Sequence, residues 1–426
     1  YNGSENFTPK NRYGFFPSVG LGWVISNESF FEPLTNVIQY LKVRGTWGQV
    51  GNSQISGRRF AYLATVTDSS STSYTFGKNM DQNYGTTAID EYAVDVTWEV
   101  ADKTDIGVDM RLLNNKLNLQ FDYFKESREG IYLRRSSIPS YVGMINNPYG
   151  NIGKVENKGF ELSVNYANSW GGDWSLSLMG NYSFNRNKVL EDDSTVVYPW
   201  QNTIGNKVGQ RFGLVALGLF ESYGEIAASP VQTGDTRPGD IKYKDINGDG
   251  KIDEYDKVPI GWGSVPEIMY GFGFSVGWKN LSLTAMFQGA AHVDAMLSGE
   301  GVLPFSQGSS RGNLLSNITD RWTEENPRQN AFYPRLSIGN INMNYEESTW
   351  WLKDTDYLRL KNIELSYRLP DHWMKRIHLD NARIFIQGVN LLTFSSFKIW
   401  DVELGDGRGA RYPNIASVSL GVNFNF

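Results

Sequence analysis

One acidic stretch of this sequence has residue types and a spacing that could bind a metal ion. Oxygen-bearing residues recur through residues 245–256, and Gly250 stands where a calcium-binding loop makes its sharpest turn. Ca²⁺ prefers about six to eight hard oxygen ligands, which such a spacing wraps around one centre. The expected ligands are Asp245, Asn247, Asp249, the carbonyl of Lys251, Asp253 and Asp256. The sequence therefore predicts a calcium site that stiffens a loop.

The last ligand position of this loop leaves the affinity open. Asp256 stands where the motif usually has the longer Glu, so its carboxylate reaches less far toward a metal. The alternative interpretation is an acidic turn without a metal.

Aromatic residues in the long connections form a second group of candidates. Aromatic faces bind sugar rings and peptide side chains while a polar edge stays hydrated. The alternative, which we favour for any single residue, is that these rings hold loops together or belong to an aromatic girdle. The ligand-contact candidates are Tyr198, Trp200, Trp262, Tyr333, Trp350, Trp351 and Trp400.

Several classes of function lack their residues here. The 426-residue chain has no Cys, so it has no disulfide, thiolate metal site or Cys nucleophile. Its three His stand in no catalytic or zinc motif, and no phosphate-binding glycine loop is present. A net charge of −6 argues against a nucleic-acid partner. We expect neither an enzyme nor a nucleic-acid-binding protein.

The elements that must position these residues are strands. In residues 416–426 apolar side chains alternate with small or polar ones, which gives a strand with one apolar and one polar face. No apolar run approaches the ~18 residues of a membrane helix. Similar alternation predicts about 11 strands, at residues 13–25, 37–49, 104–112, 117–123, 160–166, 174–184, 270–278, 281–287, 357–369, 382–392 and 416–426.

The lengths of the connections identify the architecture. Short and long links alternate along the chain, as in an up-and-down meander whose long loops all lie at one end. Outer-membrane β-barrels have this form, with short periplasmic turns and long extracellular loops, whereas a soluble Greek-key sandwich mixes its loop lengths. The predicted fold is an all-β, transmembrane antiparallel up-and-down β-barrel. The predicted extracellular loops are 52–92, 135–153, 188–263, 292–354 and 393–412.

Two details of the strand pattern need an explanation. The apolar phase slips between Leu360 and Ile363, which predicts a β-bulge. The strand count is odd, whereas bacterial single-chain barrels usually have an even number. Either one strand is missing from the count, with Leu214 to Glu221 as the candidate, or the chain is part of a barrel.

Several motifs, taken in order, resemble the C-terminal half of a SusC/RagA-type TonB-dependent outer-membrane transporter. Together they span nearly the whole chain. They are residues 13–18 (YGFFPS) leading into 22–23 (GW), 41–52 (LKVRGTWGQVGN), 97–99 (TWE), 103–107 (KTDIG), 157–161 (NKGFE), 238–240 (PGD), 357–362 (YLRLKN) and 412–413 (YP).

The resemblance implies a barrel of about 22 strands with an N-terminal plug. It also implies energy from TonB through that plug, a SusD-like surface lipoprotein as lid, and oligomeric glycans or peptides as cargo. Residues 1–426 would be the C-terminal part of the barrel in the bacterial outer membrane, with the plug and the remaining half outside this sequence. A passive porin or a surface adhesin is the competing interpretation.

The last strand carries two further expectations. An open sheet edge in lipid leaves backbone groups unsatisfied, so the free edge of residues 416–426 must be paired. We expect its partner outside this sequence rather than in residues 13–25. The terminal Phe426 resembles the signal read by barrel-assembly machinery.

Overall fold

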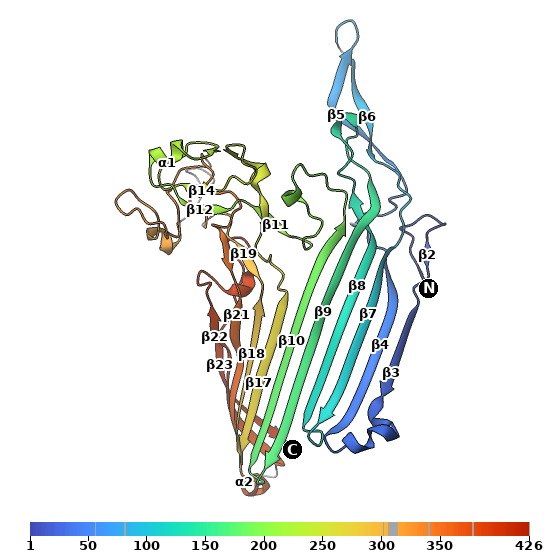
Figure 1. The fold of residues 1–426 in the computed structure, drawn as a ribbon, viewed down its shortest axis with the longest axis vertical. Coiled ribbons are helices and arrows are strands. Elements are labelled where there is room, and N and C mark those ends of the chain that lie inside the picture. The colour runs from blue at the N-terminus through green and yellow to red at the C-terminus, as the bar shows by residue number, and fades with distance from the viewer. Residues whose placement is uncertain are drawn as a thin grey trace.

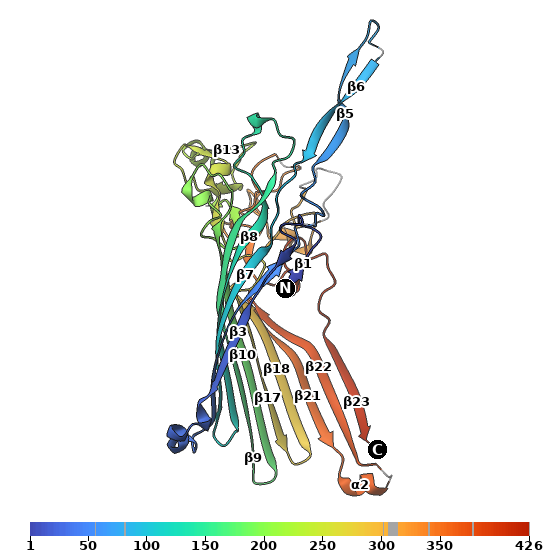
Figure 2. The same ribbon diagram turned by 90° about the vertical axis from the view of Figure 1, so that its right-hand side faces the viewer.

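The computed structural model describes residues 1–55, 57–80, 82–300, 302–305, 314–339, 341–376 and 379–425. Phe426 lies outside these residues. One 11-stranded antiparallel sheet dominates (Figures 1 and 2), in the order β23-β22-β21-β18-β17-β10-β9-β8-β7-β4-β3. Its strands are β3 (Ser18–Val24), β4 (Ile38–Asn52), β7 (Glu99–Leu112), β8 (Leu117–Arg134), β9 (Tyr149–Trp170), β10 (Trp174–Glu191), β17 (Ile268–Trp278), β18 (Leu281–Ala291), β21 (Tyr357–Arg368), β22 (Asn381–Ser395) and β23 (Ser417–Asn425).

This order confirms the predicted meander and the number of strands. Each strand of the sheet pairs with the next one along the chain, and the curved sheet forms a wall with β3 and β23 at its edges. Within the described residues, β23 therefore pairs with β22 and not with residues 13–25, as expected. That a strand from outside this sequence pairs with β23 stays a prediction.

The short links lie together at one end of the sheet (Figure 1). Asn114 and Asn115 have φ of 59° and 63°, Gly171 and Gly172 have 61° and 72°, and Lys279 has 52°. Tight hairpin turns need this left-handed backbone, which Asn and Gly adopt at least cost. The two longer links of this end contain η1 (Ile25–Asn27) with η2 (Ser29–Leu34), and α2 (Asp371–Arg376).

The predicted bulge is present. The register between β21 and β22 shifts between Leu360 and Asn362, and the register between β18 and β21 shifts at the same place. Lys361 is the extra residue that lets the apolar phase change.

The long connections contain more structure than the sequence indicated. Residues 52–92 include a hairpin of β5 (Thr65–Phe76) and β6 (Gln82–Glu91), which projects beyond the sheet (Figure 1). The alternative prediction, that an additional barrel strand lies near Leu214 to Glu221, is wrong. That segment holds β12 (Ala216–Leu219), which pairs with β14 (Ile241–Tyr243) outside the large sheet. Its Leu214 and Leu219 are buried among the long loops, whereas Leu217 is 56% exposed.

The described residues of three long loops, 188–263, 292–354 and 393–412, fold into one body that we call the cap. Its core includes Leu214, Ile241, Trp322, Tyr333 and Phe397, which come from all three loops. Further elements of the cap are η4 (Pro199–Gln201), β11 (Arg211–Gly213), α1 (Tyr223–Ala227), β13 (Val231–Gln232), β15 (Lys251–Ile252), η5 (Glu254–Asp256), β16 (Val258–Ile260), β19 (Asp294–Met296), η6 (Ser316–Thr319), β20 (Leu352–Asp354) and η7 (Val402–Leu404).

The other end regions are small. β1 (Asn2–Gly3) pairs with β2 (Tyr13–Gly14), and η3 (Ser140–Val142) lies between β8 and β9. A second core of Phe7, Ile55, Ala61, Val96 and Tyr132 forms where the N-terminal segment meets the tops of the strands. Within the described residues, no helix is long and apolar enough to cross a membrane.

Candidate functional site

A buried carboxylate joins two loops of the cap. Asp240, which follows the turn at Gly239, is 1% exposed. Arg335 donates two hydrogen bonds of 2.9 Å to its two carboxylate oxygens. The amides of Asn342 and Asn344 donate two more, of 3.1 and 2.8 Å. A buried charge is stable only when paired and fully hydrogen-bonded, so this network fixes loop 188–263 against loop 292–354.

The third loop is attached to the same body by a second carboxylate. Asp406 accepts hydrogen bonds of 2.7 and 2.8 Å from Arg211 and one of 2.9 Å from the amide of Met296. Arg359, at the top of β21, is also paired with Asp401 and Glu403 at 2.7 Å. The cap is therefore connected by ion pairs to the strand it stands on.

The predicted calcium loop lies in the cap as a closed turn. Asp245 accepts hydrogen bonds from the amides of Gly248 and Gly250, at 2.6 and 2.9 Å. Asp256 is fully buried and accepts from the amides of Ile246 and Asp253, at 2.7 and 2.9 Å. The Asp256 carboxylate thus joins the backbone at the start of the loop to the backbone near its end. The short Asp side chain is long enough for these contacts.

The oxygens of this loop have the right chemistry for calcium but are used differently in the structure. Asn247 and Asp249 bond each other and the amides that follow them. Asp253 caps η5 through the amide of Tyr255, at 2.8 Å. Within the described part of the chain, no three carboxylate or imidazole side chains are arranged around a point that could hold a metal ion.

Two candidate aromatic residues support this loop. Tyr198 and Trp200 are stacked, with ring centroids 4.6 Å apart. The indole of Trp200 donates 2.8 Å to the carbonyl of Tyr255, and Gln201 donates 3.0 Å to that of Glu254. The pair thus holds η5, the last turn of the predicted calcium loop.

The other candidate aromatics separate into buried and accessible rings. Tyr333 and Trp351 are 0% and 1% exposed, so they form the core of the cap and have no free face for a ligand. Trp350 and Trp400 are half-buried against that core. Trp262 is 42% exposed. It is therefore the candidate best placed to meet a ligand.

Trp262 belongs to a charged cluster at the top of the sheet. Its ring is stacked on His292, with centroids 4.0 Å apart. Glu267 accepts a hydrogen bond of 2.6 Å from Arg186 and lies 3.6 Å from Lys207 and 3.2 Å from His292. Sequence reasoning missed this cluster because its members are far apart along the chain and form no motif.

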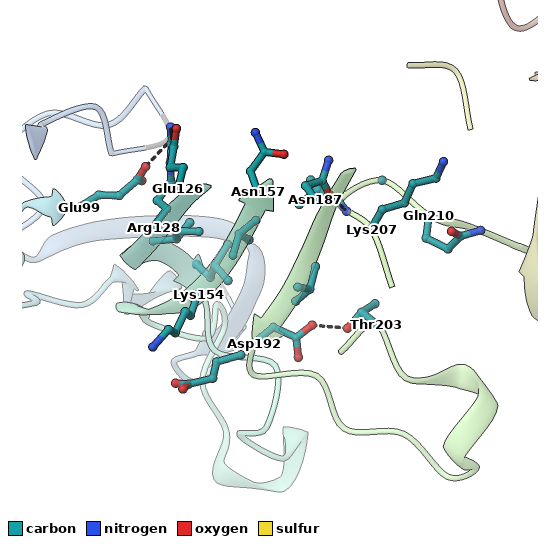
Figure 3. Close-up of a pocket in the computed structure, with 18 of the residues that line it drawn as sticks. Glu99, Glu126, Arg128, Lys154, Asn157, Asn187, Asp192, Thr203, Lys207 and Gln210 are labelled. Atoms are coloured by element: carbon teal, nitrogen blue, oxygen red, sulfur yellow. Dashed lines mark hydrogen bonds and ion pairs between the residues drawn. The ribbon is translucent and has the colours of Figure 1, made fainter. Parts of the chain in front are cut away.

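A cavity of about 820 Å³ opens beside Lys207, on the polar side of β8, β9 and β10 (Figure 3). Asn157 pairs with Asn187 across β9 and β10, and Glu126 pairs with Asn157 across β8 and β9, so these side chains share the inward face. The segment before β11 covers them, contributing Thr203, Lys207 and Gln210. The polar alternation predicts this face, but only the folded segment shows the cavity.

The cavity wall carries side chains of both positive and negative charge. Arg128 is paired with Glu99 at 2.9 Å and with Glu126 at 2.8 Å. On the cap side, burial raises the pKa of Asp192, but hydrogen bonds from Ser194 and Thr203 outweigh burial and lower it. Asp192 is therefore a stable anion at the mouth of the cavity. The wall offers amides, cations and anions to a polar ligand.

Comparison with known proteins identifies the family to which this chain belongs. Residues 1–391 match the family described as TonB dependent receptor-like, beta-barrel. The chain belongs to this family. It is therefore part of an outer-membrane β-barrel, as the sequence resemblance predicted.

The relatives place the chain within this receptor family. It is 28% identical to TonB-dependent receptor P3 of Formosa agariphila, covering 100% of this chain and 43% of that protein. It is 27% identical to TonB-dependent receptor SusC of Bacteroides thetaiotaomicron, covering 100% of this chain and 41% of SusC. The chain thus spans less than half the length of these relatives.

The solved structures agree on the fold. The RagAB peptide importer in its open-open state matches with a TM-score of 0.73 and 22% identity, over 99% of this chain and 44% of that one. At this identity the likeness shows the fold, which confirms the predicted barrel architecture.

Proposed function

We propose that this chain is the C-terminal part of the barrel of an outer-membrane nutrient importer. The observation that carries the proposal is an 11-stranded sheet in a chain that belongs to the TonB-dependent receptor family. Its edge strands β3 and β23 each have only one neighbour among the described residues. A second set of strands would close such a sheet into a barrel of about 22 strands. In this proposal the energy comes from TonB through a plug, and a SusD-like lipoprotein covers the cap.

The proposed cargo is an oligomeric glycan or peptide. The similar proteins include SusC and a peptide importer. The polar cavity of this chain also supports the proposal. Its carboxamides and paired charges can hydrogen-bond both sugar hydroxyls and peptide amides. The chain has no role as an enzyme in this proposal.

Uptake by cells tests the proposal. Cells would express the full-length protein or its Asn157→Leu/Asn187→Leu variant and receive defined oligosaccharides or oligopeptides as sole nutrient. We expect TonB-dependent growth on one class, reduced in the variant and unchanged in Asn165→Leu, which lies outside the cavity lining. Growth without TonB, together with open-channel conductance in bilayers, would instead establish a porin. Neither uptake nor conductance, with retained surface attachment, would establish an adhesin.

We also propose that Ca²⁺ binds the loop at residues 245–256 and stiffens it. The support is the oxygen-bearing spacing, with Gly250 at the turn and a φ of 82°. Binding would require Asp245 and Asp249 to exchange backbone amides for the ion. Calcium should therefore slow protease cleavage between residues 244 and 257 in the wild type but not in Asp245→Ala. Equal cleavage with calcium and with chelator in the wild type would reject the site.

A further inference from the structure

Three cations stand side by side on the outward face of the sheet. Lys125 of β8 is paired in register with Lys158 of β9, and Lys158 is paired with Arg186 of β10. The lysine side chains are 50% and 58% exposed. Like charges directly opposite each other on neighbouring strands are destabilising. Anions must therefore offset the repulsion within this row.

The position of the row is set by two rows of aromatic residues on the same face. At the short-turn end, Trp174 is paired in register with Trp170 and Trp278. At the other end, Phe160 is paired with Tyr123 and Phe184. Such rows mark the two surfaces of a bilayer around a transmembrane barrel. Lys125, Lys158 and Arg186 each lie two residues beyond the upper row, toward the long loops.

The spacing of the aromatic rows fits a membrane. Trp174 and Phe184 lie ten residues apart on β10. At a rise of about 3.3 Å per residue this is roughly 33 Å along the strand, or about 25 Å along the membrane normal for a strand tilted by about 40°. An apolar band of a barrel has this height. The cation row thus lies at the head-group level of the outer leaflet, where β8, β9 and β10 rise beyond β17 (Figure 1).

The local carboxylates do not neutralise this surface. Glu156 lies 2.8 Å from Lys125 and 3.6 Å from Lys158, and it is paired in register with Lys188 on the same face. Lys125 and Lys158 thus share this one carboxylate within 4 Å, which leaves one positive charge between them. Arg186 is already paired with Glu267.

We propose that Lys125 and Lys158 of this row bind the phosphate groups of an outer-leaflet glycolipid. The acyl chains of the lipid would lie along the apolar face below, and the aromatic row would meet the base of its head group. The two lysines are separate from the cavity, because their positions lie on the opposite face of the sheet from Glu126 and Asn157, which line it. Arg186 reaches Glu267 and the cap, so it is not part of the lipid site.

Lipid binding by the native protein purified in detergent tests this proposal. The probe is diphosphorylated lipid A in mixed micelles, compared with its dephosphorylated form. Each Lys near an anionic lipid surface is worth about fivefold in affinity, so Lys125→Gln/Lys158→Gln should bind lipid A about thirtyfold more weakly. Heat-modifiable gel migration checks that the barrel is folded.

Lys103→Gln is the matched control. Lys103 precedes Thr104, which pairs with Lys125, so it lies at the same height but on the inward face beside Glu126. It should bind lipid A like the wild type. Equal binding by the double variant, or equal binding of the two lipid forms by the wild type, would overturn the proposal. Displacement of lipid A by millimolar inorganic phosphate would overturn the head-group assignment in favour of a free-phosphate site.

Discussion

Replacing Asp240 by Ala should let loop 188–263 separate from loop 292–354 within the cap, while the barrel stays folded. The change leaves Arg335, whose side chain is 18% exposed, without its carboxylate, and it removes an acceptor from Asn342 and Asn344. Breaking a buried ion pair by removing one partner costs about 3–5 kcal/mol. A free-energy loss of this size raises the open population of the cap roughly 150- to 5,000-fold.

Limited proteolysis measures this opening. Lys242 and Lys244 are trypsin sites beside Asp240. Cleavage of a transiently open state follows its population when closing is fast. Cleavage in Asp240→Ala should therefore accelerate by about two to four orders of magnitude, while the barrel keeps its heat-modifiable migration. The control is Asp235→Ala, since Asp235 forms an exposed pair with Arg237 at 2.7 Å and should leave the rate unchanged. Wild-type cleavage in Asp240→Ala would refute the assigned role of the buried network.

Two further changes test the cap at other points. Gly239→Ala should also destabilise the cap by about 2–5 kcal/mol, because its φ is +87° and an added Cβ would lie 2.2 Å from the ring of Trp322. Gly248→Ala, with φ +77° and no atom within 4 Å of the added Cβ, should cost only about 1–2 kcal/mol. Equal losses of unfolding free energy for the two variants in denaturant titrations would contradict the packing argument. Burial alone would raise the pKa of Asp401. The hydrogen bonds that Asp401 accepts from Arg359 and from the backbone of Glu403 outweigh burial and lower this pKa. The docking of loop 393–412 should thus be complete above the ordinary aspartate pKa of about 4 and weaken as the pH falls through the lowered pKa. Hydrogen exchange of the loop backbone measures this docking. In Asp401→Asn the docking should already be weaker at neutral pH, and it should not change further as the pH falls.

Local features of the sequence were sufficient to predict the barrel wall. Side-chain alternation identifies a strand without its neighbours, and Asn114-Asn115 and Gly171-Gly172 specify tight turns through their own backbone preferences. The bulge at Lys361 was visible as a change of phase. These signals lie within a few residues of each other, so the chain carries them before it folds.

The long loops could not be predicted in the same way. Tyr333 and Trp351 have the residue types of a ligand site, yet burial among three loops makes them core residues. Asp240 needs Arg335, about a hundred residues away, before it is more than an acidic loop residue. The cavity likewise exists only because the segment before β11 folds back over β10.

The sequence by itself determined the strands, their turns and the family, because each depends on short-range pattern. Only the tertiary structure decided which loop residues are core, which line the cavity and which cations stand together. Lys125, Lys158 and Arg186 are unremarkable in three separate strands, and strand register alone brings their charges into one row. Register is set by pairing between distant segments, and the repulsion it creates is a property of the folded sheet.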